Sequence, residues 1–207
     1  GVAAFVPTLE KYIDRYDVDL NLQSTLLAVD GSTKTARFKQ GDGEVVKEFD
    51  FIHVVPPQIA PGFIRSSELA DDAGWFAVQP DTLRHVKYEN VYGVGDVINA
   101  PNAKTAAAVR KQVPVVADNL MASIAGKSLV AAYNGYGACP LVVEKGKVVL
   151  AEFGYGGKLL PSLPLDGTKP SRFGWIFKRY MLPGIYWDFM LKGREVMVKP
   201  DPLAPDV

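Results

Sequence analysis

Alternating apolar and polar residues predict a β-rich segment in the first quarter of the chain. Before it, an amphipathic pattern predicts a helix over residues 7–16. Asp-Gly and Gly-Asp-Gly turns separate four short runs with strand-like patterns. These runs cover residues 18–22, 25–30, 34–39 and 45–49.

The middle of the chain combines apolar strand-like runs with one long helical pattern. The run Phe51-Ile-His-Val-Val55 predicts a buried strand. Shorter strands are expected over 75–78 and 90–94, and the second leads into a glycine turn. A helix is predicted from about Ala103 to Ala125.

The last part carries a hairpin signal followed by two aromatic-rich helical patterns. Leu141-Val-Val143 and residues 147–153 flank a Glu-Lys-Gly-Lys turn, which is typical of a β-hairpin. Residues 171–182 and 184–191 are rich in large apolar side chains and are separated by Pro183. The expected fold class is therefore α+β or α/β, with an amphipathic helix pair near the end.

Composition narrows the possible functions. The chain has 207 residues, of which 48% are hydrophobic, and its 23 basic and 23 acidic side chains give zero net charge. This balance argues against a nucleic-acid surface. No uninterrupted apolar run reaches the roughly 18 residues of a membrane-spanning helix. Two histidines and one cysteine lie too far apart to suggest a metal site.

The segment Asn90-Val-Tyr-Gly-Val-Gly-Asp96 has the pattern of a cofactor-binding turn. Its glycines, including Gly95, allow close backbone approach, and the Asp96 carboxylate can accept hydrogen bonds from hydroxyl groups. Lys104 and Thr105 begin the following helix, whose positive end favours an anion. In flavoproteins with two dinucleotide-binding domains, this arrangement holds the ribityl chain of FAD. The simpler alternative is a turn that only closes a connection, with a solvated lysine beside it.

A complete dinucleotide site needs a Gly-x-Gly-x-x-Gly fingerprint for the pyrophosphate. Gly41-Asp-Gly43 and Gly93-Val-Gly95 both lack the third glycine at that spacing, and the chain begins with Gly rather than Met. The sequence is therefore expected to be the C-terminal part of a longer flavoprotein.

Several motifs in a consistent order resemble sulfide:quinone oxidoreductase, within the flavin disulfide-reductase-like superfamily, and most closely the branch that includes the mitochondrial enzymes. The motifs are Phe51-Ile-His-Val-Val-Pro-Pro57, Asp72-Ala-Gly-Trp75, Tyr92-Gly-Val-Gly-Asp96, Lys104-Thr-Ala-Ala-Ala-Val109, Tyr133-Asn-Gly-Tyr-Gly-Ala-Cys-Pro-Leu141 and Leu150-Ala-Glu-Phe153. The similarity extends from about residue 5 to residue 193.

The resemblance implies an enzyme that oxidises sulfide to persulfide or polysulfide and reduces ubiquinone through FAD, with a sulfur acceptor as a further partner. It also implies a remnant of the NAD-like domain over 1–50, part of the FAD-binding domain over 51–128, and a C-terminal domain over 129–207. Pro57 is expected to lie near the flavin. The fragment alone is expected to be inactive and cofactor-free.

The same resemblance implies a role for Cys139. By residue type alone, a single cysteine is usually a small buried hydrophobe. In the resembled family, the cysteine of the Cys-Pro-Leu motif is one of two redox cysteines beside the flavin, and the second would lie outside this chain. Of the two histidines, His53 is a structural or proton-handling candidate in an apolar run, whereas His85 is expected to be solvated.

The aromatic-rich C-terminal helices suit the interface of an anionic membrane, because Trp and Tyr favour headgroup depth and basic side chains attract anionic lipid. Packing on the protein's own core is the alternative. The resemblance favours a peripheral protein of the bacterial or mitochondrial inner membrane, with an aromatic quinone channel. Candidates to line it are Phe153, Tyr155, Phe173, Tyr186 and Trp187.

Two other kinds of function remain open from the sequence. One is a related flavoenzyme, either a type II NADH:quinone oxidoreductase, which would not need Cys139, or the flavoprotein of flavocytochrome c sulfide dehydrogenase. The other is a cofactor-free binding module at a membrane interface.

Overall fold

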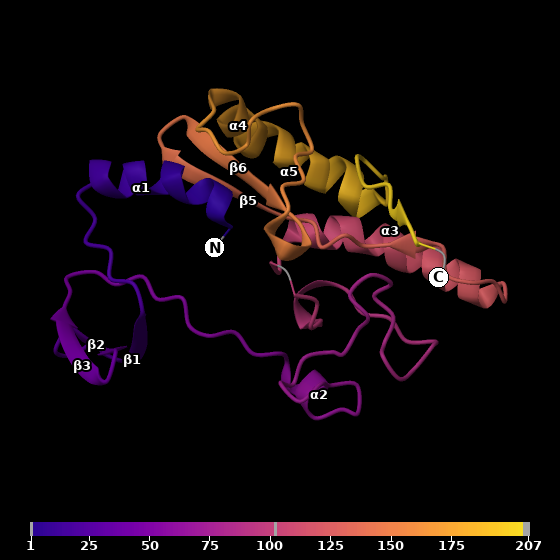
Figure 1. Ribbon diagram of the computed structural model, residues 1–207, viewed down its shortest axis with the longest axis horizontal. Coiled ribbons are helices and arrows are strands. Elements are labelled where there is room, and N and C mark those ends of the chain that lie inside the picture. Colours follow the sequence, from indigo (N-terminus) through magenta and orange to yellow (C-terminus); the bar gives the residue numbers. More distant parts are fainter. Residues whose placement is uncertain (1, 102, 205–207) are drawn as a thin grey trace. The chain divides into compact units, whose positions relative to one another are not determined.

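The computed structural model describes residues 2–101 and 103–204, in two compact units (Figure 1). The larger unit is formed by Gly1–Glu10 and Ile59–Val207, and the smaller by Lys11–Gln58. Small sheets and helices alternate along the chain, so the predicted mixed α and β content is confirmed. The assignment of the three segments to dinucleotide-binding and C-terminal domains stays a prediction.

The smaller unit is an antiparallel sheet in the order β1-β2-β3. Its strands are β1 (Ser24–Asp30), β2 (Thr35–Gln40) and β3 (Gly43–Glu48), as the alternation predicts. Asp30 organises the first turn, because its Oδ1 accepts hydrogen bonds from the backbone N–H groups of Ser32 and Thr33.

The predictions of two further strands in this unit are wrong. Residues 18–22 form irregular chain and a turn, and left-handed backbone at Asp17 and Gln23 interrupts an extended path on either side. The run Phe51–Val55 is also irregular, and Phe51 and Val55 are 86% and 80% exposed. An apolar run becomes a buried strand only when another strand pairs with it, and no strand among residues 2–101 and 103–204 does so.

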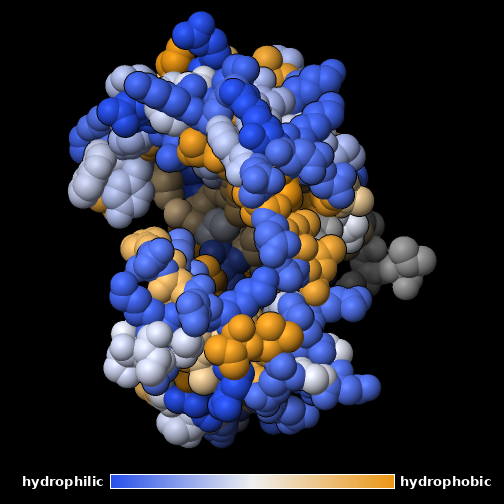
Figure 2. Space-filling view, turned by 90° about the vertical axis from the view of Figure 1, so that its left-hand side faces the viewer, coloured by the Kyte–Doolittle hydropathy of each residue, from blue (hydrophilic) through white to orange (hydrophobic). Residues whose placement is uncertain are grey.

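Apolar side chains on the molecular surface form patches between hydrophilic ones on the face drawn in Figure 2. In the smaller unit, the exposed apolar residues include Leu22, Leu27, Val29 and Val46. Scattered exposed apolar side chains are ordinary for a folded protein, so their presence alone assigns no function.

The N-terminal segment begins in the larger unit. A short 3-10 turn, η1 (Ala3–Phe5), leads into α1 (Val6–Arg15), which confirms the helix predicted over 7–16. Phe5 is buried, and Thr8 Oγ1 donates a hydrogen bond of 2.7 Å to the Thr168 carbonyl. The start of the chain is thus fixed to a loop far along the sequence.

The larger unit is organised around α3 (Ala106–Ile124) and a hairpin of β5 (Gly137–Glu144) and β6 (Lys147–Phe153). Both were predicted, although the helix begins three residues later than expected. Thr105 caps it by accepting a hydrogen bond from the Ala108 N–H. A second small sheet pairs β4 (Ala131–Ala132) with β7 (Asp201–Pro202).

The segment between α2 (Gly62–Arg65) and α3 is held by single bridges rather than by strands. Phe76 bridges to Ala70 and Ile98, and Arg84 bridges to Tyr92. The strands expected over 75–78 and 90–94 are therefore reduced to isolated pairs. Apolar side chains compensate by packing into a core of Ile64, Phe76, Val78, Leu83, Ile98, Val115, Tyr133 and Tyr136.

His85 is buried in this core, which overturns the expectation that it is solvated. Its Nδ1 accepts the backbone N–H groups of Lys87 and Tyr88 at 3.0 and 3.2 Å, and its Nε2 lies 3.2 Å from the Leu69 carbonyl. This pattern places the ring proton on Nε2. The polar sequence around His85 is misleading because its hydrogen-bond partners are backbone groups.

The two C-terminal helices predicted on either side of Pro183 are one continuous helical stretch. It runs through α4 (Arg172–Ile176), η4 (Phe177–Met181), α5 (Leu182–Gly184), η5 (Ile185–Phe189) and η6 (Met190–Lys192). The wider π-helical turns η4 and η5 flank Pro183, and the Leu182 N–H donates to the Phe177 carbonyl five residues earlier. This register accommodates the proline without a break. No helix in the described part of the chain is long and apolar enough to cross a membrane.

Asn119 connects α3 to two other parts of the larger unit and is fully buried. Its Nδ2 donates to the Thr82 and Ala131 carbonyls, and its Oδ1 accepts the N–H groups of Val130 and Ala131. One amide therefore satisfies four backbone groups that the interior would otherwise leave unpaired.

We expect Asn119→Ala to lower the free energy of unfolding by about 3 kcal/mol or more, since each unpaired buried group costs about 1–3 kcal/mol. Urea unfolding followed by circular dichroism measures the effect. The exposed Asn90→Ala is the control and should change little. Equal midpoints for the two variants would show that the Asn119 bonds do not support the fold.

Candidate functional site

The predicted cofactor turn is a short 3-10 element, η2 (Gly95–Val97), close to the start of α3. A Cβ on Gly93 would lie 2.6 Å from Phe76 Cδ1, so this glycine serves the packing of the core. Gly95 has φ +77° and donates its N–H to the buried Gln112 Oε1 at 2.7 Å. The adjacent Asp96 is exposed.

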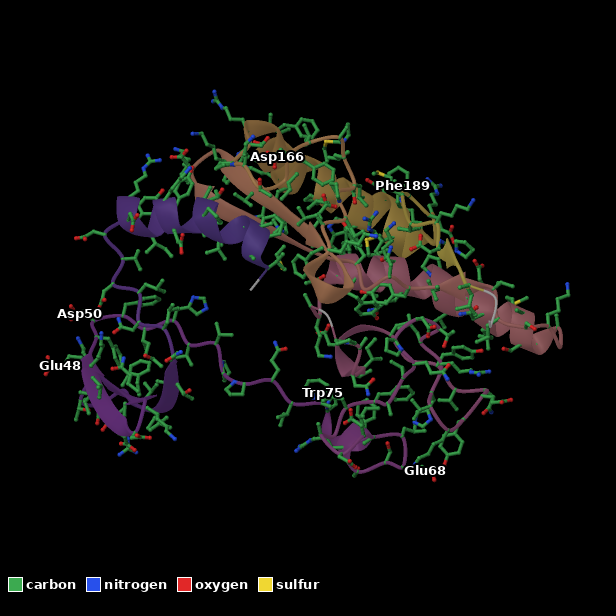
Figure 3. The ribbon with its side chains drawn as sticks, viewed as in Figure 1. Glu48, Asp50, Glu68, Trp75, Asp166 and Phe189 are labelled. Atoms are coloured by element: carbon green, nitrogen blue, oxygen red, sulfur yellow. The ribbon has the colours of Figure 1, made fainter. Side chains whose placement is uncertain are left out.

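Lys104 is held beside this turn by Trp75, which Figure 3 labels. Its Nζ lies 4.2 Å from the Trp75 ring centroid and donates a hydrogen bond to the Ile98 carbonyl. Burial lowers the pKa of Lys104, and the Asp96 and Asp71 carboxylates partly oppose that shift. The ammonium is therefore positioned at the turn rather than freely solvated.

These groups fit one part of an FAD molecule. An exposed carboxylate at Asp96 can accept hydrogen bonds from a chain of hydroxyls, and the left-handed Gly95 turn allows close approach. The N-terminus of α3, capped by Thr105, presents a positive dipole end nearby. Pro57 lies exposed in the smaller unit, so its proximity to this turn stays a prediction.

Cys139 is the third residue of β5, lies opposite Ala151 on β6, and is partly buried. Burial raises the pKa of its thiol. Its neighbours Ala138 and Pro140 line a cavity, whereas Cys139 does not. Successive strand residues point to opposite faces, so the thiol belongs to the other face of the hairpin.

That cavity has a volume of about 310 Å³ and lies between the start of α3, the β5-β6 hairpin and the C-terminal helical stretch. Most of its wall is apolar and includes Ala138, Pro140, Leu150, Phe177 and Tyr186. Its size is at the lower end of the range for small-molecule sites. We call it the hairpin cavity.

A polar cluster of Tyr136, Glu152 and Ser162 lies in the wall of the hairpin cavity. Tyr136 Oη donates to Glu152 Oε1 at 2.5 Å, and the Ser162 N–H donates to Glu152 Oε2 at 3.1 Å. Burial, reinforced by the bond to Glu152, raises the pKa of Tyr136 to about 12. Sequence reasoning missed this cluster, although two members lie within the motifs that carry the family resemblance.

The hairpin cavity includes one of the five aromatic residues expected to line a quinone channel. Tyr186 lines it and makes a T-shaped contact of 5.0 Å with Trp187, which lies outside the wall. Tyr155 instead donates its hydroxyl to the Pro80 carbonyl at 2.6 Å. Phe153 pairs with Gly137 at the end of the hairpin.

Phe173 is the last of the five aromatic residues expected to line a quinone channel, and its stacking partner, rather than Phe173 itself, reaches the hairpin cavity. Phe173 stacks on Phe177 with ring centroids 6.4 Å apart, and Phe177 lines the hairpin cavity. The aromatic-rich pattern contained Phe177, but spacing alone could not order the rings.

Among residues 2–101 and 103–204, no three His, Cys, Asp or Glu side chains form a group that could hold a metal ion.

Comparison with known proteins identifies relatives along most of the chain. No family model matches it. The chain is 40% identical over 194 residues to "Sulfide:quinone oxidoreductase, mitochondrial" of Dictyostelium discoideum, and 36% identical over 197 residues to that of Mus musculus. These alignments cover 93% of this chain but only 43% and 44% of the two relatives. The Schizosaccharomyces pombe protein of the same name is 38% identical over 183 residues, covering 85% of this chain and 40% of its own.

These matches confirm the resemblance to the C-terminal portion of sulfide:quinone oxidoreductases. The chain spans less than half the length of these curated relatives. A chain of the cryo-EM structure of the Tetrahymena thermophila mitochondrial ATP synthase F1Fo tetramer shares the fold, with a TM-score of 0.72. It is 22% identical and the match covers 86% of this chain and 44% of that one, so this likeness concerns the fold alone.

The raised pKa of Cys139 gives a testable pH dependence. Only the thiolate reacts with iodoacetamide, so a raised pKa lowers the reactive fraction at about pH 8. We expect the pH midpoint of alkylation to lie above that of the urea-unfolded chain. Restricted access alone would slow the reaction without moving the midpoint, and coinciding midpoints would contradict this prediction.

Proposed function

We propose that this chain forms the C-terminal part of an FAD-dependent sulfide:quinone oxidoreductase. The observation that carries the proposal is the 36–40% identity to three such proteins over 85–93% of the chain. The geometry adds support, because a cofactor-type turn and an apolar cavity lie at the same end of α3, where Thr105 caps the helix and also lines the cavity.

Bound FAD would supply two-electron redox chemistry between a sulfur substrate and a quinone. Asp96 would accept hydrogen bonds from the ribityl hydroxyls, while Gly95 lets the backbone approach closely. Lys104 and the start of α3 would favour negative charge on the ring system. Trp75 would keep the Lys104 ammonium at the turn.

Cys139 would be one of two cysteines that carry sulfur. Attack of sulfide on a disulfide between them would form a new S–S bond on one cysteine and release the other as a thiolate. The sequence contains one cysteine, so its partner would come from outside this sequence. Persulfide sulfur would then leave to an acceptor.

The hairpin cavity would receive the quinone ring. Its apolar wall and the aromatic rings of Phe177 and Tyr186 suit a flat uncharged ligand, because stacking supplies contact without charge. The polar cluster of Tyr136, Glu152 and Ser162 gives the same cavity a place to orient ligand oxygens.

The C-terminal helical stretch would place the protein on a membrane. Four of its side chains, Ile176, Tyr180, Trp187 and Leu191, are 50–65% exposed, which argues against packing on the protein's own core. Basic residues accompany them, including Lys178, Arg179 and Lys192. This combination suits the interface of an anionic bilayer, and it supports a peripheral position on a bacterial or mitochondrial inner membrane.

The central test uses the complete natural protein under anaerobic conditions. We expect sulfide to remove the oxidised-flavin absorption band in the wild type but not in Cys139→Ser, because the sulfur-carrying thiol is lost. Val142→Ser changes an exposed residue on the same strand and should bleach as the wild type does.

Two other outcomes would redirect the assignment. Bleaching by NADH but not by sulfide would indicate a type II NADH:quinone oxidoreductase and make Cys139 structural. A protein without bound flavin would favour the binding module at a membrane interface.

Membrane association is tested by co-sedimentation with vesicles that contain anionic phospholipid. We expect the double substitution Tyr180→Ala and Trp187→Ala to weaken binding by about tenfold or more, since a buried aromatic contributes about 1.5–3 kcal/mol. Phe63→Ala removes an equally exposed aromatic from α2 and should leave binding unchanged. Equal losses in both variants would show that the helical stretch is not the docking surface.

A further inference from the structure

A second, smaller cavity adjoins the hairpin cavity and runs along α3. Its volume is about 160 Å³. Arg110, Ile185 and Met190 line both cavities, so the two meet at these side chains. We call the second one the side groove.

The side groove has apolar walls on two sides. Val109 and Val113 stand one helical turn apart on α3, with Pro114 beside them. Phe189 and Met190 face them from the C-terminal helical stretch, and Val196 and Val198 add further apolar lining. A ligand in this groove would meet hydrocarbon along most of its length.

The charges near the groove do not call for a charged ligand. Arg110 Nη1 already donates a hydrogen bond of 2.7 Å to the Val196 carbonyl. This bond ties the segment after the helical stretch to α3 and holds that side of the groove in place. Arg194 and Glu195 carry opposite charges, so Arg110 leaves the lining with a single net positive charge, and its guanidinium is already engaged with the Val196 carbonyl.

We propose that the side groove binds the polyprenyl chain of a quinone whose ring occupies the hairpin cavity. This inference rests on the proposed function and extends it to the ligand's tail. Small-molecule sites usually enclose about 300–1,000 Å³. At about 160 Å³, the groove is too small for an independent site but suits the first part of a chain that continues from the larger cavity.

Burial of each methylene of such a chain contributes to binding through removal of apolar surface from water. The side groove would therefore raise the affinity for quinones with isoprenoid tails over tail-free ones. The ring contacts in the hairpin cavity would be common to both, so the difference between them reports on the groove.

The test compares tail-free ubiquinone with ubiquinone carrying two isoprenoid units in the complete natural protein. We expect Val113→Trp to raise KM for the tailed quinone by about tenfold, which corresponds to about 1.4 kcal/mol, and to change KM for the tail-free quinone less than about twofold. Val113 is 49% exposed, so the indole can enter the groove without overpacking a closed core.

Met121→Trp is the matched control, because Met121 lies on the same helix, is exposed and lines neither cavity. It should leave both KM values unchanged. Equal increases for the two quinones in Val113→Trp, or no change in either, would overturn the assignment of the groove to the tail.

Photo-crosslinking separates this inference from the proposed function, since it needs no turnover. A ubiquinone with a diazirine on its second isoprenoid unit should label peptides that contain residues 109–114 and 185–198. Labelling elsewhere, or equal labelling of the groove by a diazirine fatty acid that the tailed quinone does not displace, would overturn it. Failure of sulfide to reduce any quinone would instead refute the proposed function, and the labelling pattern would still decide the place of the tail.

Discussion

Two buried amide side chains on α3 hold together the parts of the larger unit that carry the site. Gln112 accepts the N–H of Gly95 and so fixes the turn that presents Asp96. Two turns later on the helix, Asn119 binds four backbone groups, including both polar atoms of Ala131 before the hairpin. Buried amides are favourable only when their partners are in place. The helix, the cofactor-type turn and the entry to the hairpin therefore form as one unit.

Local patterns predicted the elements whose stability is local. The β1-β2-β3 sheet and the β5-β6 hairpin are marked by turn residues and alternation, and α3 by its length. Phe51–Val55 was misread because burial of an apolar run depends on a pairing strand that the run itself does not encode. Pro183 was misread as a break between two helices. The π-helical turns η4 and η5 accommodate the hydrogen bond that proline cannot make, and no pattern of residues in the sequence predicts such turns.

The candidate site divides in the same way. Asp96, Lys104 and Thr105 were accessible to sequence reasoning because they lie within ten residues, in two neighbouring motifs. The contact of Lys104 with Trp75 and the cluster of Tyr136, Glu152 and Ser162 were not, since they join residues 10 to 29 positions apart. Family resemblance pointed to the segments that contain most of these residues, but it could not show which side chains of each segment meet.

The C-terminal helical stretch contributes side chains both to the wall of the hairpin cavity and to the exposed surface. Phe177, Ile185 and Tyr186 from this stretch line the cavity, while Tyr180 and Trp187 of the same stretch are exposed. If the exposed set enters the interface, the cavity wall lies within one helix diameter, about 10–12 Å, of the lipid. An apolar ligand could then pass from bilayer to cavity without crossing bulk water, which avoids the free-energy cost of exposing its apolar surface to water.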